Sequence, residues 1–309
     1  TIKPPSYGAA IVRVHGTKKS LAMTTDCNSN YCKYDPFIGT IHAVSEARRN
    51  IISTGAVPLA ITNNLNFGNP EDKNIMGQFV MSVKGMINSC KKYSLPVISG
   101  NVSLYNETNK IGISPTPVIG MIGLIKNTNS RNKKSLIKEN DKIYLIGKKT
   151  NNISCSSFLE RIILKNNKNL GPPPPINYNE EIKNGNFVLN LFKNNLIKYC
   201  NDVSSGGTII SLLKMLINKQ FGVEIEESFT NNTNNNQIFY KILFGENAGN
   251  YIVIINNEEK VKELAKKNKV SLFKIGIMKK NYLNINNQII KLNELKNNFE
   301  NNFFNYINN

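Results

Sequence analysis

The sequence predicts a mixed α/β protein of two domains, and three observations indicate this fold. A chain of 309 residues is longer than a single ordinary hydrophobic core requires. Short apolar runs typical of strands alternate with segments of helical periodicity along the chain. A polar segment at residues 127–140 separates the halves, so we expect an amino-terminal domain at 1–126, a linker and a carboxy-terminal domain at 141–309.

In the first half, strand and helix signals follow one another regularly. A helix is expected at residues 41–53, with Gly55 as its stop. A second, longer helix is predicted by apolar side chains spaced three and four residues apart, namely Met76, Val80, Val83, Ile87 and Cys90. Apolar runs predict strands at residues 10–14, 21–24, 57–62, 96–99 and 118–125.

The second half has the same mixture of elements. Four prolines at residues 172–175 predict a stiff, extended connector, and the asparagine-rich tract at 230–237 predicts a surface loop. The expected strands are 142–146, 222–225, 251–255 and 270–277. The expected helices are 158–164, 182–199, 208–218 and 258–267.

Composition excludes several classes of protein. Hydrophobic residues make up 40% and charged residues 19%, and no apolar run approaches the ~18 residues of a membrane helix, so we expect no membrane partner. The net charge of +18 comes from scattered lysines among asparagines, without an aromatic-interleaved basic motif. We therefore expect a solvated surface and no nucleic-acid partner, although the positive field favours a nucleotide substrate.

The cysteines predict neither zinc nor a disulfide framework, because they are odd in number, lack paired spacing and are accompanied by only two histidines. Cys27 and Cys32 flank a candidate site, but neither has an obvious histidine and acid partner, so we expect packing roles rather than catalytic ones. Free thiols without a leader sequence suggest a cytoplasmic protein. The first residue is Thr1 rather than methionine, which suggests a fragment.

Polar segments at strand ends are the candidates for binding, because ligand-contacting residues concentrate where a rigid scaffold presents loops. Four are present: Thr24-Thr25-Asp26-Cys27-Asn28, residues 62–70, Ser99-Gly100-Asn101-Val102-Ser103-Leu104-Tyr105-Asn106-Glu107, and Asn201-Asp202-Val203-Ser204-Ser205-Gly206-Gly207. Asp26 is the acid nearest to the candidate site, and the alternative role for it is a turn residue.

The segment at residues 99–107 is interpreted as a phosphate- and metal-binding loop. Gly100 allows a phosphate to approach the backbone, Asn101 offers a carbonyl oxygen to Mg²⁺, and Ser103 offers a hydroxyl to a substrate. A polar turn stabilised by its own side chains explains the same residues. Asn63 and Asn64 are expected to join this site only if strands 57–62 and 96–99 are neighbours.

At residues 201–207, two glycines precede an apolar helix. Their backbone N–H groups are suited to bind an anion, but Ser204 or Ser205 capping the helix is an equal explanation. Glu107 and Glu246 are not expected to act as an acid–base pair, because nothing in the sequence brings them together. No catalytic residue is assigned.

Together, these segments resemble phosphoribosylformylglycinamidine synthase in its small multi-subunit form. The resemblance runs from about Ala9 to about Ile255 and includes residues 115–121 and the Gly-Pro-Pro-Pro-Pro string from Gly171. It implies an aminoimidazole-ribonucleotide-synthetase-like fold of two α/β domains, the first contributing to a barrel at a pseudo-dimer interface. The family subunit contains this pair twice, and the chain resembles the second copy.

The resemblance also implies an activity in purine biosynthesis. ATP phosphorylates the amide oxygen of formylglycinamide ribonucleotide, and ammonia from a glutaminase subunit displaces the phosphate to give the amidine. Mg²⁺ would orient the phosphates. A small accessory subunit is a further implied partner.

By this resemblance Asn63 and Gly100 would contact ATP, Asn101 would bind Mg²⁺ and Ser103 would contact the ribonucleotide. The chain departs from the family pattern at Asn63, where aspartate is usual, and at Asn201, Ser205 and Ala248. The family's catalytic histidines belong to the first copy, so this chain alone is expected to be inactive.

Two alternatives stay open. A non-catalytic nucleotide-binding module would bind ATP without turnover even when the missing half is supplied. A free-standing relative, such as aminoimidazole ribonucleotide synthetase or a thiamine-phosphate kinase, would carry its own acidic metal cluster near the amino terminus, and no such cluster is evident from the sequence.

Overall fold

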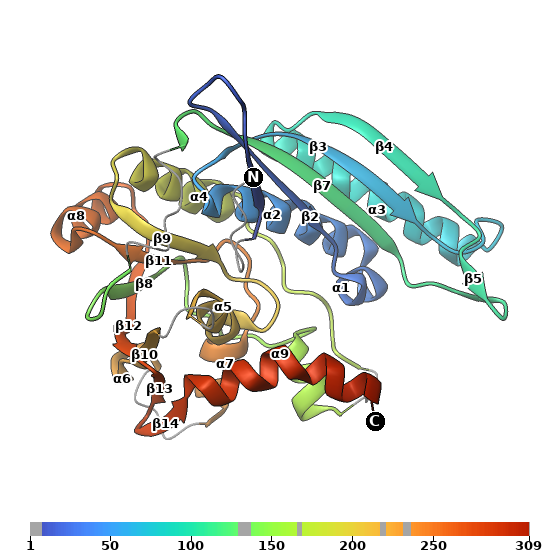
Figure 1. Cartoon of the computed structure of the whole chain (residues 1–309). Coiled ribbons are helices and arrows are strands. Elements are labelled where there is room, and N and C mark those ends of the chain that lie inside the picture. The colour runs from blue at the N-terminus through green and yellow to red at the C-terminus, as the bar shows by residue number, and fades with distance from the viewer. Residues whose placement is uncertain (1–7, 129–136, 166–168, 217–220, 231–235, 309) are drawn as a thin grey trace.

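Two mixed sheets, one in each half of the chain, organise the structure (Figure 1). The computed structural model describes residues 8–128, 137–165, 169–216, 221–230 and 236–308. The first sheet has five strands in the order β1-β2-β7-β3-β4, and the second has seven in the order β14-β13-β10-β12-β8-β11-β9. The predicted mixed α/β fold class is confirmed. None of the described helices is long and apolar enough to cross a membrane.

The helices that the structure describes cover one face of the first sheet only. Its strands are β1 (Ala10–Arg13), β2 (Ser20–Asp26), β3 (Val57–Asn66), β4 (Val97–Ser103) and β7 (Thr116–Ile125). The helices are α1 (Ser29–Tyr34), α2 (Pro36–Ser53) and α3 (Lys73–Tyr93), and a short hairpin joins β5 (Glu107–Thr108) to β6 (Ile111–Gly112). Figure 1 shows α2 and α3 behind the sheet, where Val44, Ile51 and Ile119 are buried in one core.

Helix α2 begins five residues earlier than predicted because Asp35 and Pro36 form a start signal. The Asp35 carboxylate accepts a hydrogen bond from the backbone N–H of Ile38 at 2.9 Å, and proline is favoured in the first turn. Gly55, with φ of +86°, follows the helix as expected. The apolar residues of α2 face both the sheet and the second domain, so most of the helix is buried.

The second sheet lies between two layers of helices. Its strands are β8 (Lys142–Ile146), β9 (Ile197–Asp202), β10 (Phe221–Ile225), β11 (Tyr251–Ile255), β12 (Leu272–Lys280), β13 (Tyr282–Ile285) and β14 (Gln288–Lys291). The helices are α4 (Tyr178–Lys193), α5 (Gly207–Leu216), α6 (Glu227–Thr230), α7 (Asn236–Phe244), α8 (Glu258–Lys267) and α9 (Leu292–Asn308), with a π-helical turn at Leu159–Ile163.

Alternating side chains of the central strands supply separate cores on the two faces of this sheet. On β8, Leu145 packs in the core that contains residues of α5 and α7, whereas Tyr144 packs in the core that contains residues of α4 and α8. The run of buried residues along β11 reflects this double coverage, because a strand covered on both faces has no solvent-facing side.

Three sequence predictions need correction. The helix expected at 182–199 ends at Lys193, because Asn195 adopts a left-handed conformation and β9 begins at Ile197. The strand expected at 96–99 continues to Ser103, because its pairing with β3 continues that far. The helix expected at 158–164 is a π-helical turn.

Other predictions fall partly outside the described residues. Residues 129–136 of the expected linker, 231–235 of the expected loop and 217–218 of an expected helix are among them. Within the described part, residues 236 and 237 begin α7 rather than continuing the loop. The domain boundaries remain a prediction.

Candidate functional site

The two strands that carry the predicted ATP and metal residues are neighbours. Strands β3 and β4 pair in parallel, with Asn63 opposite Gly100, Asn64 opposite Asn101 and Asn66 opposite Ser103. Asn63 and Asn64 were expected to join the site only if these two strands were neighbours, and that condition is therefore met. Ligands of α/β sheets bind near the carboxyl ends of parallel strands, and these residues occupy the carboxyl-terminal halves of both.

The predicted residues form two groups rather than one. A Cβ on Gly100 would lie 2.8 Å from Oδ1 of Asn63, so the glycine makes room for the Asn63 side chain. On the next pair, Nδ2 of Asn101 donates to Oδ1 of Asn64 at 2.9 Å. Successive strand residues point to opposite faces, so the Asn63–Gly100 contact and the Asn64–Asn101 hydrogen bond lie on opposite sides of the sheet.

In the structure, the segment at 99–107 is a strand end followed by a turn. Gly100, Asn101 and Ser103 belong to β4, an edge strand with mostly exposed side chains. Ser103 and Asn106 make the local turn that the alternative interpretation describes, since Nδ2 of Asn106 donates to the Ser103 carbonyl oxygen at 3.0 Å. The backbone of β4 pairs with β3 on one side, and no described strand pairs with it on the other.

A second polar site joins two segments that the sequence presented separately. Asp26, at the end of β2, and Asp202, at the end of β9, interact through space, and Glu46 and Arg49 of α2 belong to the same group of charges. Beside it lies a cavity of about 190 Å³, lined by Gly8, Glu46, Asn50, Asn201, Asp202, Ser204 and Lys214. We call Asp26, Glu46 and Asp202 the carboxylate cluster.

Electrostatics disfavour full ionisation of the carboxylate cluster. Burial is the main cause that raises the pKa of all three groups, and Asp202 adds to the effect on Glu46, whose pKa rises to about 7. Arg49 acts in the opposite direction on each carboxyl. Asp202 is 3% exposed, and its Oδ2 has no hydrogen-bond partner among the described residues.

Sequence reasoning missed Glu46 and Arg49 because they lie within a helix and match no motif. The available signal was their spacing with Asn50, because residues 46, 49 and 50 of one helix lie on the same side of it. Asn50 binds the cluster directly, since its Nδ2 donates to Oδ2 of Asp26 at 3.0 Å. Within the described ranges, no group of three or more His, Cys, Asp or Glu side chains is arranged to hold a metal ion.

The glycine-rich helix start already binds an anion from its own chain. The Glu246 carboxylate accepts hydrogen bonds from the Gly206 N–H at 2.7 Å, from the Ser157 N–H at 2.8 Å and from the Tyr31 hydroxyl at 2.8 Å. The N–H of Gly207 is bonded to the Ser204 carbonyl oxygen. This start is therefore not an open anion site in the structure.

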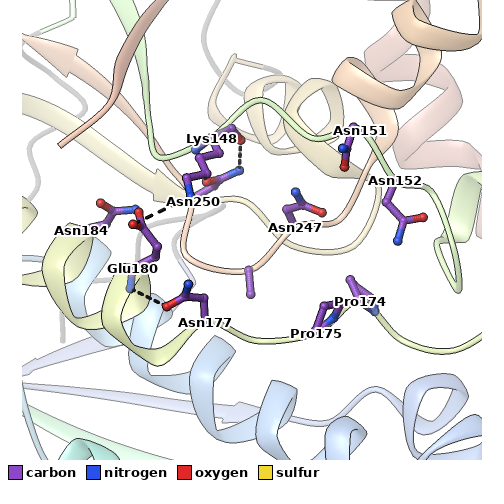
Figure 2. A pocket seen from close by; sticks show the side chains of 11 residues that line it. Lys148, Asn151, Asn152, Pro174, Pro175, Asn177, Glu180, Asn184, Asn247 and Asn250 are labelled. Atoms are coloured by element: carbon purple, nitrogen blue, oxygen red, sulfur yellow. Dashed lines mark hydrogen bonds and ion pairs between the residues drawn. The ribbon is translucent and has the colours of Figure 1, made fainter. Parts of the chain in front are cut away.

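A third feature is a cavity of about 320 Å³ in the second domain (Figure 2). Asparagine side chains from three loops and α4 line it, together with Lys148 and two prolines. Ala248 also lines it, at a position where the resemblance expects glutamine.

Comparison with known proteins identifies both halves of the chain. Residues 7–125 match the model of the AIR synthase related protein, N-terminal domain, and residues 138–283 match that of the corresponding C-terminal domain. The chain is 42% identical over 290 residues to phosphoribosylformylglycinamidine synthase subunit PurL of Pelagibacter ubique, covering 93% of this chain and 39% of that protein.

Solved structures share the fold. Thermotoga maritima PurL complexed with FGAR matches with a TM-score of 0.64 at 21% identity, covering 90% of this chain and 36% of that chain. AaThiL complexed with AMPPCP and TMP matches with a TM-score of 0.64 at 16% identity, covering 92% of this chain and 89% of that one.

The chain thus spans about two fifths of the length of the curated PurL proteins that it matches. The consecutive domain matches account for most of its residues. We conclude that the chain belongs to the AIR synthase related family and comprises one pair of its N-terminal and C-terminal domains.

Proposed function

We propose that this chain is part of an ATP-dependent amide ligase of purine biosynthesis. The reaction joins glutamine-derived ammonia to formylglycinamide ribonucleotide and gives formylglycinamidine ribonucleotide. The observation that carries the proposal is the pairing of β3 with β4, which brings Asn63 beside Gly100 and Asn64 beside Asn101. The 42% identity to a PurL subunit supports the same reaction.

Each predicted residue has a proposed role at this sheet edge. Asn63 and Gly100 contact ATP, because the glycine gives access to the backbone beside a side-chain amide. Ser103 contacts the ribonucleotide, with its hydroxyl 3.2 Å from Oδ1 of Asn106. Gly100 and Asn101 are exposed, so these assignments fit a site that another polypeptide could complete.

Asn101 is the proposed Mg²⁺ ligand. Its Nδ2 donates to Asn64, which leaves Oδ1, a hard oxygen donor, available to a cation. Mg²⁺ commonly takes one or two protein ligands and completes its coordination with water and phosphate oxygens, so a single amide oxygen is enough. Because Asn101 and Asn63 face opposite sides of the sheet, the phosphates of ATP would pass around the edge strand β4 to reach the ion. The ion would neutralise phosphate charge during the transfer.

The chain is proposed to act with a first half that carries the catalytic histidines, a glutaminase subunit and a small accessory subunit. The uncovered face of the first sheet supports this proposal. Met23 and Leu59 on this face, and Ile98 and Val102 on the edge strand β4, are at least 40% exposed. Exposed apolar patches rimmed by polar residues mark interaction surfaces. A solved assembly described as PurLQS of Thermotoga maritima contains a structural relative.

A non-catalytic nucleotide-binding module is the second candidate, and the neutral amide of Asn63 favours it. An aspartate at this position would carry a charge that an asparagine lacks, so contacts with a metal or cation are weaker here. The two candidates predict the same ATP affinity but different turnover.

The test is reconstitution. We expect ATP-dependent amidine formation, with ADP released, when the chain is mixed with a first-half polypeptide, the glutaminase and the accessory subunit. Saturating ammonia and Mg-ATP remove any dependence on the glutaminase. ATP binding without amidine formation under those conditions would reject the ligase and support the binding module, whereas absence of ATP binding would reject both.

A further inference from the structure

Two thiols meet at the start of α1. The side chain of Asn28 caps this helix by accepting a hydrogen bond from the backbone N–H of Tyr31 at 3.2 Å. Cys27 is the residue before the cap, and Cys32 is the fourth residue of the helix. Side chains at these two positions pack against each other in many helices, where they form a hydrophobic staple. The fold of the helix start therefore brings Cys27 and Cys32 together.

The two thiols lie within reach of each other in the structure. Each is the main influence on the pKa of the other, and both cysteines are free. Cys32 is completely buried where α1 meets α2, and a Cβ on Gly39 would lie 2.5 Å from the Cys32 backbone nitrogen. The close approach of the two helices holds the Cys32 thiol in place.

The two cysteines differ in access. Cys27 is only partly buried, so a small reagent reaches it, whereas Cys32 is shielded from solvent. Their contact lowers the pKa of the Cys27 thiol and raises that of Cys32 well above its usual range. The thiolate is the reactive form of cysteine, so Cys27 is the nucleophile of the pair and Cys32 is the resolving partner.

We propose that Cys27 and Cys32 form a reversible thiol–disulfide site that a small disulfide, such as oxidised glutathione, oxidises. The Cys27 thiol loses its proton to solvent, and its sulfur attacks one sulfur of glutathione disulfide. That S–S bond breaks, a mixed disulfide forms and the first glutathione leaves as thiolate. The Cys32 sulfur, as its proton leaves, then attacks the Cys27 sulfur and releases the second glutathione.

This site is independent of the ligase proposal, since it requires only the helix start and the two thiols. Two protein thiols are oxidised to one disulfide, and one glutathione disulfide is reduced to two thiols. Excess glutathione reverses the exchange. Asp26 directly precedes Cys27 and belongs to the carboxylate cluster, so the bond would link the end of β2 to α1 beside that cluster.

The experiment uses the intact folded chain in glutathione buffers of increasing disulfide fraction. Acid quenching, alkylation and peptide mass spectrometry then report each cysteine. The peptide spanning residues 27–32 should lose two hydrogens and resist alkylation, and reduced glutathione should restore both thiols. Cys90, which is also partly buried but has no cysteine partner among the described residues, serves as the internal control.

Two variants separate the steps. Cys32→Ser should accumulate glutathione on Cys27, several-fold faster than on Cys90, because the second step is blocked. Cys27→Ser should leave Cys32 reduced. Circular dichroism verifies folding, and Cys90→Ser is the matched control, which should form the disulfide as the unaltered chain does.

Three outcomes would overturn the proposal. They are a wild-type chain that keeps both thiols in excess glutathione disulfide, glutathione addition to Cys27 no faster than to Cys90, and a disulfide that forms only after the chain is unfolded in urea. The first and third use the unaltered chain, so they remain decisive if a variant fails to fold.

Discussion

At the scale of single residues, Glu46 is the clearest case of a carboxyl group whose surroundings shift its pKa. The residue is half-buried, and its carboxyl lies in the interior near Asp202 and the guanidinium of Arg49. Burial and the neighbouring carboxyl outweigh the attraction of the arginine, and the pKa rises from 4.5 to about 7. The folded state therefore binds this proton more tightly than the unfolded chain.

Replacement of Glu46 by glutamine tests this balance. The stability that protonation contributes is complete below pH 4.5 and is lost as the pH rises to about 7. Glu46→Gln should therefore increase the free energy of unfolding at pH 8 by on the order of 1 kcal/mol and leave it nearly unchanged at pH 4. Urea unfolding at both values measures this difference.

Glu263→Gln is the matched control, because Glu263 is exposed and lies in α8. It should change stability little at either pH. A loss of stability in Glu46→Gln at pH 8 would show that the carboxylate is net favourable in the fold and contradict the expected direction.

Gly100 tests the proposed ATP contact. In Gly100→Ala the new methyl group would lie within 3 Å of the Asn63 amide, so that side chain must turn away. ATP affinity should fall at least several-fold, and the free energy of unfolding should change by less than about 1 kcal/mol because the strand is exposed. Isothermal titration with Mg-ATP measures the affinity.

Gly77→Ala is its control. Nothing lies within 4 Å of a Cβ at Gly77, which is an exposed position of α3, so alanine should stabilise the chain by about 0.5–1 kcal/mol without affecting ATP. Unchanged ATP affinity in Gly100→Ala would remove Gly100 and Asn63 from the nucleotide site.

At the scale of elements, α2 is the helix that joins the domains. Arg49 forms a buried ion pair with Glu181 of α4, and Nη1 of Arg48 donates to the Glu181 carbonyl oxygen at 3.2 Å. His42 reaches the proline connector, where its Nε2–H donates to the Pro174 carbonyl oxygen at 2.7 Å. One helix therefore serves the core of the first sheet and the contact with the second domain.

Removal of one member of the buried pair should be costly. Arg49 and Glu181 are 2% and 1% exposed, so Glu181→Ala leaves a guanidinium in the interior without its partner. We expect a loss of about 3–5 kcal/mol in unfolding free energy. Glu180→Ala, one residue earlier on α4 and partly exposed, should cost less than about 1 kcal/mol. Equal losses in the two variants would contradict the role assigned to the pair.

His42 predicts a separate sensitivity to acid. Burial lowers its pKa from 6.5 to about 4, so the fold favours the neutral ring. Stability is complete above pH 6.5 and falls as the pH approaches 4, by on the order of 3 kcal/mol. His42→Gln retains a hydrogen-bond donor for the Pro174 carbonyl oxygen. In urea unfolding, it should reduce the fall in unfolding free energy between pH 6.5 and 4. Ionisation of Glu46 lowers stability as the pH rises, whereas protonation of His42 lowers it as the pH falls. The acidic and the basic part of the stability profile are therefore each tested with a separate variant.

At the scale of the whole molecule, the two sheets differ in coverage. Helices cover both faces of the second sheet but one face of the first, and Figure 1 shows the strands of the first sheet with no helix in front of them. A two-layer arrangement with an open apolar face requires another surface to exclude water. The proposed first half of the ligase supplies such a surface.

Charge on this face should weaken that association. Leu59 is 46% exposed on β3, and Leu59→Lys should reduce the binding of the chain to the first half, as measured by sedimentation velocity. Ile162→Lys is the control, since Ile162 is 60% exposed in the π-helical turn of the second domain. Equal effects of both substitutions would mean that the sheet face is not the contact.

Local patterns predicted much of this architecture, and their failures have local reasons. The long helix α3 and the central strands were found because their apolar periodicity is strong. The extent of β4 was missed because Gly100, Asn101 and Ser103 are turn-forming residue types, and only pairing with β3 makes them a strand. The false extension of the helix at 182–199 arose because Ile197 and Tyr199 continue an apolar pattern that fits a strand as well.

The sequence by itself determined the mixed α/β class and the polar segments at Asp26, Asn63, Gly100 and Asp202, because residue type and periodicity are local properties. Only the tertiary structure decided which segments meet. Parallel pairing placed Asn63 beside Gly100, and the packing of α2 between the domains brought Asp26, Glu46 and Asp202 together. Contacts between residues that are far apart in the sequence depend on how sheets and helices pack. Local sequence patterns do not specify that packing.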